Sequence, residues 1–493
     1  MRTRRTTTLG ATEGGLIIPD IYALSNSVAA APYAIETEQN TGVNSAYASA
    51  SLGYQEFLFL DGTVRHDAFS TLPYGNNSVN TFSASASYVF TKHLKADWLD
   101  FGKFRASYAE NPQGNIDPYS LTNVFDKFNP FGSNQLYSRP SVGANPDLRP
   151  VKTTSQELGL EMQFLQKRIG FDVSVYKSLS SDQIFPVDYS TATGYSKKYI
   201  NAGSVENKGI EVQFNAGIVR NKDFQWDVFV NWSKNENTVV ALAPGVDVLT
   251  LGSFQGNVSI IATKGHAYGD IIGKDYIYAA DGQRIVENGS YKMTTTTNNV
   301  IGNVTPDWIG GIRNKFTYKQ FSLGFLLDMQ KGGDIFSLDQ YYGQDSGLYT
   351  STAGNNELGN PVRNTIANGG GVILPGVDSV TGLPNTTRTS FPEKAGSIYG
   401  YTKNPQKAFV YDASYIKLRE VNITYSFPSQ LVNKMKLTDL KFSIVGSNLW
   451  IIDKNLPDAD PESGLSSGNL SAGYSGGSLP TTRNIGCNLT FKF

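Results

Sequence analysis

Hydrophobic and polar residues alternate along much of the chain with a period of two. The clearest example is the stretch from Ser204 to Asn235. On either side of a polar break at 220–223, the alternate residues are Ile210, Val212, Phe214, Ala216 and Ile218, and then Phe224, Trp226, Val228, Val230 and Trp232. Successive side chains of a strand point to opposite faces, so this pattern predicts a β-hairpin with one apolar and one polar face.

Similar strands recur from residue 43 to the C-terminus. Besides the two strands of 204–235, the pattern predicts strands over 43–55, 57–69, 79–92, 98–110, 153–166, 169–185, 305–319, 321–333, 413–428, 438–452 and 481–493, which makes thirteen. Residues 1–42 show no sustained alternation and are predicted to be a loop. Short turns join the two strands of each hairpin, whereas long segments such as 334–412 join one hairpin to the next.

The strand lengths and the sorting of the connections predict the fold class. The strands have about 12 to 16 residues, enough to cross a bilayer when tilted and longer than the usual strand of a soluble protein. Short turns on one side and long loops on the other are typical of outer-membrane barrels. We therefore predict an all-β, transmembrane, antiparallel up-and-down β-barrel. A soluble β-rich binding protein is the disfavoured alternative, because the aromatic rows carry no charge.

Composition narrows the choice of function. The net charge of −1 argues against a nucleic-acid partner, since no basic stripe is present to neutralise phosphates. The single cysteine, Cys487, excludes an internal disulfide. No motif supports an enzyme, a cofactor or a metal site. The acidic run 458–462 could hold calcium, but a solvated loop is the preferred reading because the glycine and spacing of an EF-hand are absent.

The last strand alternates up to the final residue of the chain. Its apolar positions are Ile485, Cys487, Leu489, Phe491 and Phe493. An aromatic C-terminal residue on a lipid-facing row is what the outer-membrane assembly machinery is generally thought to recognise. Leu489, Phe491 and Phe493 are therefore predicted to act in barrel assembly, and the alternative is a last strand that ends in phenylalanine by chance.

Longer ordered segments carry a second kind of signal. They are NPDLRPVKTTSQELG at 145–159, ATGY at 192–195, NAG at 201–203, NKGIE at 207–211, WSKN at 232–235, IGN at 301–303 with Pro306, YIKLREV at 415–421, GSNLW at 446–450 and LPTTR at 479–483. Together they resemble the C-terminal part of a SusC/RagA-type TonB-dependent outer-membrane transporter. The resemblance implies import of oligosaccharides, or in some members of peptides. It also implies a SusD-like surface lipoprotein as lid, and energy from the TonB complex through a contact at the N-terminal end of the transporter.

The sequence also departs from that family. A signal peptide, a TonB box and a folded plug precede the barrel in the family, and none is recognisable here. Barrels of large transporters have about 22 strands, and thirteen strands leave two unpaired edges that lipid does not tolerate. We therefore expect an incomplete barrel of the outer membrane of a Bacteroidota-like Gram-negative bacterium. Residues 1–42 are expected to be the remnant of an extracellular loop, and 43–493 the C-terminal part of the barrel, without the plug or the TonB contact.

Candidate ligand contacts lie in the longest loop. Aromatic faces pack well on sugar rings and on peptide side chains, so Tyr341, Tyr342 and Tyr349 are candidates for substrate binding. The alternative is that these rings pack loop against loop or contact the lipoprotein lid. The first functional hypothesis is an importer of glycans, oligosaccharides or peptides set in outer-membrane lipid. The alternative is a passive porin-like or surface-adhesin barrel without TonB coupling.

Overall fold

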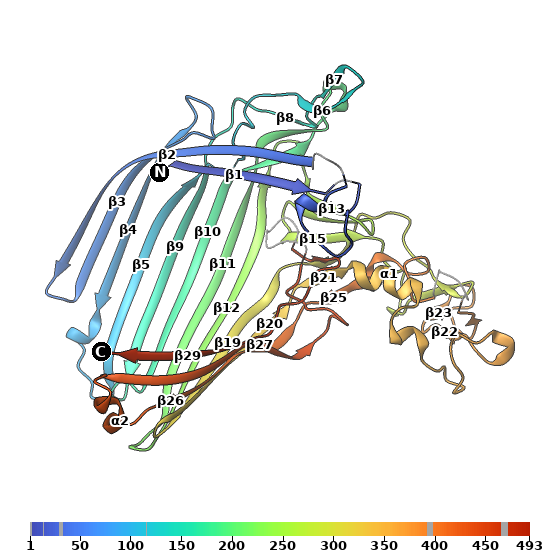
Figure 1. Cartoon of the computed structure of the whole chain (residues 1–493). Coiled ribbons are helices and arrows are strands. Elements are labelled where there is room, and N and C mark those ends of the chain that lie inside the picture. Colours follow the sequence, from blue (N-terminus) through green and yellow to red (C-terminus); the bar gives the residue numbers. More distant parts are fainter. Residues whose placement is uncertain (1, 13, 29–32, 115, 392–397, 465–471) are drawn as a thin grey trace.

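A long antiparallel sheet with a body of loops at one end makes up the molecule (Figure 1). The computed structural model describes residues 2–12, 14–28, 33–114, 116–391, 398–464 and 472–493. Fourteen strands follow one another across the sheet: β1 (Arg2–Ala11), β2 (Tyr33–Tyr54), β3 (Leu58–Phe69), β4 (Ser78–Val89), β5 (Leu99–Gln113), β9 (Val151–Phe164), β10 (Ile169–Asp188), β11 (Lys197–Arg220), β12 (Phe224–Leu242), β19 (Pro306–Tyr318), β20 (Phe321–Gly332), β26 (Tyr415–Ser426), β27 (Asp439–Lys454) and β29 (Asn484–Lys492). The short strand β8 (Val142–Gly143) joins β11 in parallel. Strands β1 and β29 form the two edges of the sheet.

The all-β prediction is confirmed, and the thirteen strands predicted from residue 43 onward are all present. The loop prediction for 1–42 is wrong for much of this segment, because β1 and the first part of β2 lie within it. The two strands pair in continuous register, from Arg2 opposite Gly42 to Ala11 opposite Tyr33. Threonines favour a strand here, but neither face of β1 is apolar, so a search for apolar alternation cannot detect it.

The pairing of the strands gives the sheet two distinct faces. Leu158 of β9 lies opposite Val175 of β10, which lies opposite Ile210 of β11. We call the face that carries this row the apolar face, and the opposite face the polar face. At the short-turn end, stacked aromatic rings lie on the apolar face: Trp98 with Phe164, Phe164 with Phe171, Phe224 and Trp226 with Phe316, and Phe316 with Phe325. An aromatic girdle of this kind is typical of a transmembrane barrel.

The loop body is formed mainly by the long connections after β12, β20 and β27. Its elements include β13 (Val248–Phe254), β14 (Val258–Thr263), β15 (Tyr268–Gly273), β16 (Ile285–Glu287), β17 (Ser290–Tyr291), β18 (Asn299–Asn303), β21 (Asp334–Ser337), α1 (Leu338–Ser346), β22 (Val372–Ile373), β23 (Val377–Asp378), β24 (Arg388–Thr389), β25 (Val410–Asp412) and β28 (Tyr474–Ser475). Phe336, Phe409, Ile301 and Tyr474 meet in its core, although they come from distant parts of the chain.

The remaining elements are short. They are β6 (Asp126–Phe131) and β7 (Asn134–Ser138), which pair with each other, the helix α2 (Ser429–Lys434), and 3-10 turns at Leu24–Asn26, Phe90–Lys92, Thr191–Thr193, Thr350–Ala353, Ile366–Asn368 and Gln406–Phe409. Among the described residues, no helix has the length and apolar character needed to cross a membrane.

Candidate functional site

The polar face of the sheet carries charges that are neutralised across the strands. Arg105 of β5 reaches over β9 and donates two hydrogen bonds to Asp172 of β10, at 2.9 and 2.6 Å. Lys103 and Glu161 form an ion pair at 2.7 Å. Farther along the sheet, Arg313 of β19 makes two hydrogen bonds to the carboxylate of Glu420, at 3.2 and 3.1 Å. Such a surface suits an aqueous lumen, because it is mostly polar and its charges are paired.

A second charged cluster joins β26 to the loop that follows β27. The register of β26 shifts around Arg419, which forms a β-bulge against β20. The Lys417 ammonium lies 2.5 Å from a carboxylate oxygen of Asp460 and 2.5 Å from one of Glu462. Arg419 contacts Glu462 at 2.7 Å and also pairs with Asp328 of β20. A bulge can re-aim a side chain in this way.

This cluster changes the interpretation of the acidic run 458–462. The side chains of Lys417 and Asp460 are only 4% and 1% exposed, so Asp460 is not in a solvated loop. Burial alone raises the pKa of Asp460, but the hydrogen bond and charge of Lys417 outweigh it and bring the pKa below its ordinary value. The pKa of Glu462 is lowered in the same way, against its burial, by Arg419 and Lys417. The two carboxylates are thus held by cations of the protein.

No grouping of His, Cys, Asp and Glu side chains suited to a metal ion occurs within the part of the chain that the structure describes.

The three candidate tyrosines lie on or just after helix α1. Ser337 caps the helix by accepting a hydrogen bond from the Gln340 amide, and Gly347 ends it with a φ of 74°. Tyr341 is 8% exposed, stacks on Tyr401 at 4.6 Å and meets the edge of Phe409 at 5.2 Å. Tyr341 therefore packs loop against loop.

Tyr342 presents its ring to solvent beside the same neighbour. Tyr342 is 40% exposed, and its ring lies edge-on to the ring of Tyr401, with 5.3 Å between the ring centroids. Gln255, from the turn between β13 and β14, donates a hydrogen bond to its hydroxyl at 2.9 Å. The half-buried ring of Tyr349 lies against Gly343, where a Cβ would be only 2.3 Å from the ring. No local sequence signal connects Tyr401 and Gln255 with α1, so sequence reasoning missed both.

The C-terminal strand lies as its alternation predicts. Leu489 is opposite Phe442 and Phe491 is opposite Leu440, in the last pairing of the sheet. The rings of Phe491 and Phe493 meet edge-on at 5.6 Å, and both residues are exposed. Their part in barrel assembly stays a prediction.

Known proteins resemble this chain along most of its length. Residues 8–258, just over half of the chain, match the family described as "TonB dependent receptor-like, beta-barrel". "TonB-dependent receptor P3" of Formosa agariphila is 26% identical over 484 residues, which cover 92% of this chain and 45% of that protein. "TonB-dependent receptor SusC" of Bacteroides thetaiotaomicron is 24% identical over 322 residues, which cover 63% of this chain and 29% of that protein.

A solved structure supports the fold over the whole chain. The RagAB peptide transporter superimposes with a TM-score of 0.72 at 16% identity, covering 100% of this chain and 55% of that chain. At this identity the agreement is one of fold. The chain spans about half the length of the curated relatives that it matches.

Proposed function

Because this chain belongs to the TonB-dependent receptor-like β-barrel family, we propose that it forms part of the wall of an outer-membrane importer in a Bacteroidota-like Gram-negative bacterium. The ligand is an oligosaccharide, another glycan or a peptide, and uptake is energised through TonB. A SusD-like lipoprotein serves as the lid. Strands β1 to β29 supply the barrel wall and its loops, including β1 and the part of β2 before residue 43, whereas the plug and the TonB contact belong to other parts of a longer protein. Members of this family are receptors and not enzymes.

The single observation that carries this proposal is the family match on a sheet with one apolar and one polar face. A sheet with an apolar belt, an aromatic girdle at its short-turn end and long loops at the other end is what a barrel wall in a membrane requires. The fold likeness to a peptide transporter supports peptides as one ligand class. The neutralised charges of the polar face are compatible with both ligand classes.

We further propose that Tyr342, with Tyr401 and Gln255 behind it, contacts the ligand in the loop body. The exposed ring of Tyr342 offers an apolar face, and its hydroxyl is held by Gln255. Tyr341 is buried and positions Tyr401 through stacking at 4.6 Å. Tyr349 packs on the helix through Gly343 and has a supporting role.

Uptake by living cells tests the proposal. A strain lacking the gene is compared with the restored strain for accumulation of a labelled mixture of oligosaccharides and one of oligopeptides, with and without a protonophore. We expect one mixture to accumulate only in the restored strain and only without the protonophore. Accumulation that survives the protonophore would instead indicate a passive channel, and equal accumulation in both strains would overturn the importer altogether.

Variants of Tyr342 separate the ligand contact from transport as such. We expect Tyr342→Ala to weaken ligand binding by about two- to tenfold, the range of a lost aromatic contact. Tyr342→Phe is the control, because it keeps the ring and loses only the hydrogen bond from Gln255. Equal binding by all three proteins would remove Tyr342 from the site.

For the C-terminal strand, the folded fraction in outer membranes after deletion of Phe493 tests the assembly role.

A further inference from the structure

The apolar face has a large hollow where its apolar rows give way to charged ones. The hollow has a volume of about 1170 Å³ and is lined by seven strands, from β3 to β12. One lining row runs straight across the sheet: Leu60, Ala86, Ala106, Leu158, Val175 and Ile210. Two residues farther toward the long loops, the lining row is Tyr108, Gln156, Lys177, Lys208 and Glu236.

The composition of the lining shows on which face the hollow opens. Side chains of both rows point to the apolar face, because the rows are two residues apart on every strand. The row between them, which includes Glu157 and Tyr176, also lines the hollow, but its side chains point to the polar face. The next row of the polar face, with Arg105 and Ser174, is not part of the lining. The hollow therefore opens on the apolar face.

Small side chains give the hollow its depth. Ala84, Ala86 and Ala106 lie side by side in β4 and β5. On the same face they are flanked by aromatic residues, with Phe82 on one side and Tyr88 on the other. The floor of the hollow is therefore apolar and recessed between larger rings.

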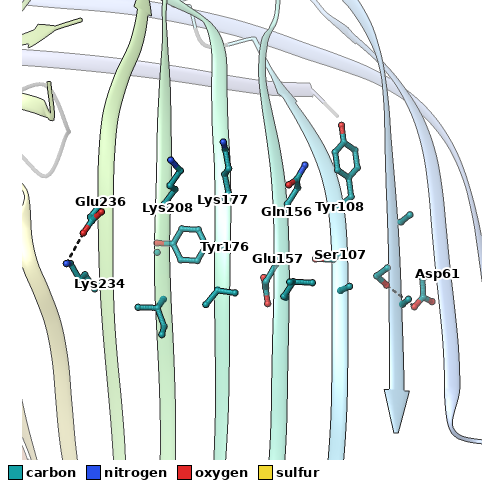
Figure 2. Close-up of a pocket in the computed structure, with 18 of the residues that line it drawn as sticks. Asp61, Ser107, Tyr108, Gln156, Glu157, Tyr176, Lys177, Lys208, Lys234 and Glu236 are labelled. Carbon is teal, nitrogen blue, oxygen red and sulfur yellow. Dashed lines mark hydrogen bonds and ion pairs between the residues drawn. The ribbon is translucent and has the colours of Figure 1, made fainter. Parts of the chain in front are cut away.

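The rim toward the long loops carries three lysines with their carboxylate partners. Lys177 and Lys208 lie opposite each other and share one carboxylate, that of Glu206, at 2.7 and 2.5 Å. Lys234 is paired with Glu236 at 2.8 Å. Figure 2 shows Lys208, Lys177, Gln156 and Tyr108 along one row, with the pair of Lys234 and Glu236 beside it.

Carboxylates lie near all three lysines of the rim, because Asp307 also attracts Lys234 and Glu236 also attracts Lys208. Glu110 and Lys152 neutralise each other at 2.7 Å, and the Tyr108 hydroxyl donates its hydrogen bond to Glu110. The side chains of Lys177 and Lys208 are each more than half exposed, so their ammonium groups can reach a ligand. The rim thus offers two exposed ammonium groups that share one carboxylate.

We propose that this hollow binds a phosphorylated acyl lipid of the membrane leaflet on the long-loop side. The acyl chains lie on the floor of alanine, leucine, valine and isoleucine, and the phosphate contacts Lys177 and Lys208. The row of these lysines is where the apolar band ends, which is the level of the lipid head groups. Lysine binds phosphate as a compact charge, and its long stem can lie along apolar surface while the ammonium reaches the head group. This site is on the opposite face from the lumen and is separate from the imported ligand.

Lipid binding to the purified chain in uncharged detergent, measured by native mass spectrometry, tests the proposal. The probes are a dioleoyl phosphatidic acid, the matching diolein without phosphate, and inorganic phosphate. We expect phosphatidic acid to bind much more tightly than diolein or inorganic phosphate. Lys177→Gln with Lys208→Gln should weaken it by about 25-fold, since each lysine near an anionic lipid surface is worth roughly fivefold. Lys95→Gln with Lys222→Gln removes the same charge near the short turns and should change nothing.

Two further variants test the rim and the floor separately. Glu206→Gln frees both lysines from their shared carboxylate and should strengthen binding of phosphatidic acid. Ala86→Phe fills the floor without a change of charge and should weaken binding of phosphatidic acid while the lysines stay in place. The proposal is overturned if diolein binds as well as phosphatidic acid, if inorganic phosphate displaces the lipid, or if the two lysine pairs behave alike.

Discussion

The sheet and the loop body are built in opposite ways. In the sheet, each residue meets the residue opposite it in register, and large apolar residues such as Leu158 and Val175 remain about half exposed. In the loop body, Phe336, Ile301 and Tyr474 come from three distant segments and are almost completely buried. The sheet therefore relies on its hydrogen-bond ladder and on the surrounding lipid, whereas the loop body relies on a core of its own.

The largest effect is expected from a cavity in the loop body. Phe336→Ala removes a fully buried ring that contacts Tyr341 and Tyr474, and should destabilise the loop body by about 3–5 kcal/mol. Because the sheet does not depend on this core, its strands should stay folded. Hydrogen exchange should therefore rise in β13, β14 and α1 and remain slow in β9, β10 and β11.

A surface variant of the same region is the control for this experiment. Leu348 is 82% exposed, so Leu348→Ala should change stability by no more than about 0.5 kcal/mol. If Phe336→Ala increased hydrogen exchange in the sheet as much as in the loop body, the two regions would unfold as one cooperative unit.

A smaller effect is expected from a charge on the apolar face of the sheet. Val212 of β11 lies between Val173 and Trp232, and Val212→Arg should destabilise the sheet in lipid by about 2–4 kcal/mol. The adjacent residue Gln213 points to the polar face, so Gln213→Arg should be nearly neutral. Urea unfolding of both variants in lipid vesicles measures the difference. The reverse order would show that the faces had been assigned the wrong way round.

The same contrast explains what could be predicted from the sequence. Thirteen strands can be predicted from local alternation, because every second side chain of a strand faces the same environment and therefore has the same polarity. Local alternation does not reveal β1, because its threonines and arginines are polar and exposed on both faces. The core around Phe336 leaves no local pattern, because its members are brought together by the fold over more than a hundred residues.

The candidate sites divide along the same line. The sequence predicts Tyr342 as a candidate because it is an aromatic residue of a long loop. Its contacts with Tyr401 and Gln255 depend on the folded structure and leave no local pattern in the sequence. The segment YIKLREV was recognised at 415–421, yet neither the bulge at Arg419 nor the carboxylates of Asp460 and Glu462 could be read from it. Long-range ion pairs have no fixed spacing along the chain.

The smallest effect is expected where the two regions join, at the cluster of Lys417, Asp460 and Glu462. The pKa values of both carboxyl groups are lowered in the folded protein, so their stabilising effect is present above the ordinary carboxyl pKa, near 4. It is lost as the pH falls through the lowered values, because the protonated acids no longer attract Lys417. The protection of residues 455–464 against hydrogen exchange, expressed relative to the intrinsic exchange rate at each pH, should therefore fall as the pH drops below about 4.

Replacing the lysine should reverse the sign of this pH dependence. In Lys417→Gln the burial of Asp460 is no longer offset by the ammonium, so its pKa should rise above the ordinary value instead of falling below it. The buried carboxyl group is then better tolerated when protonated, and residues 455–464 should be held more firmly at pH 3 than at pH 7. If residues 455–464 of the variant lost their protection against exchange at low pH as in the unchanged protein, Lys417 would not be the residue that holds this loop against the sheet.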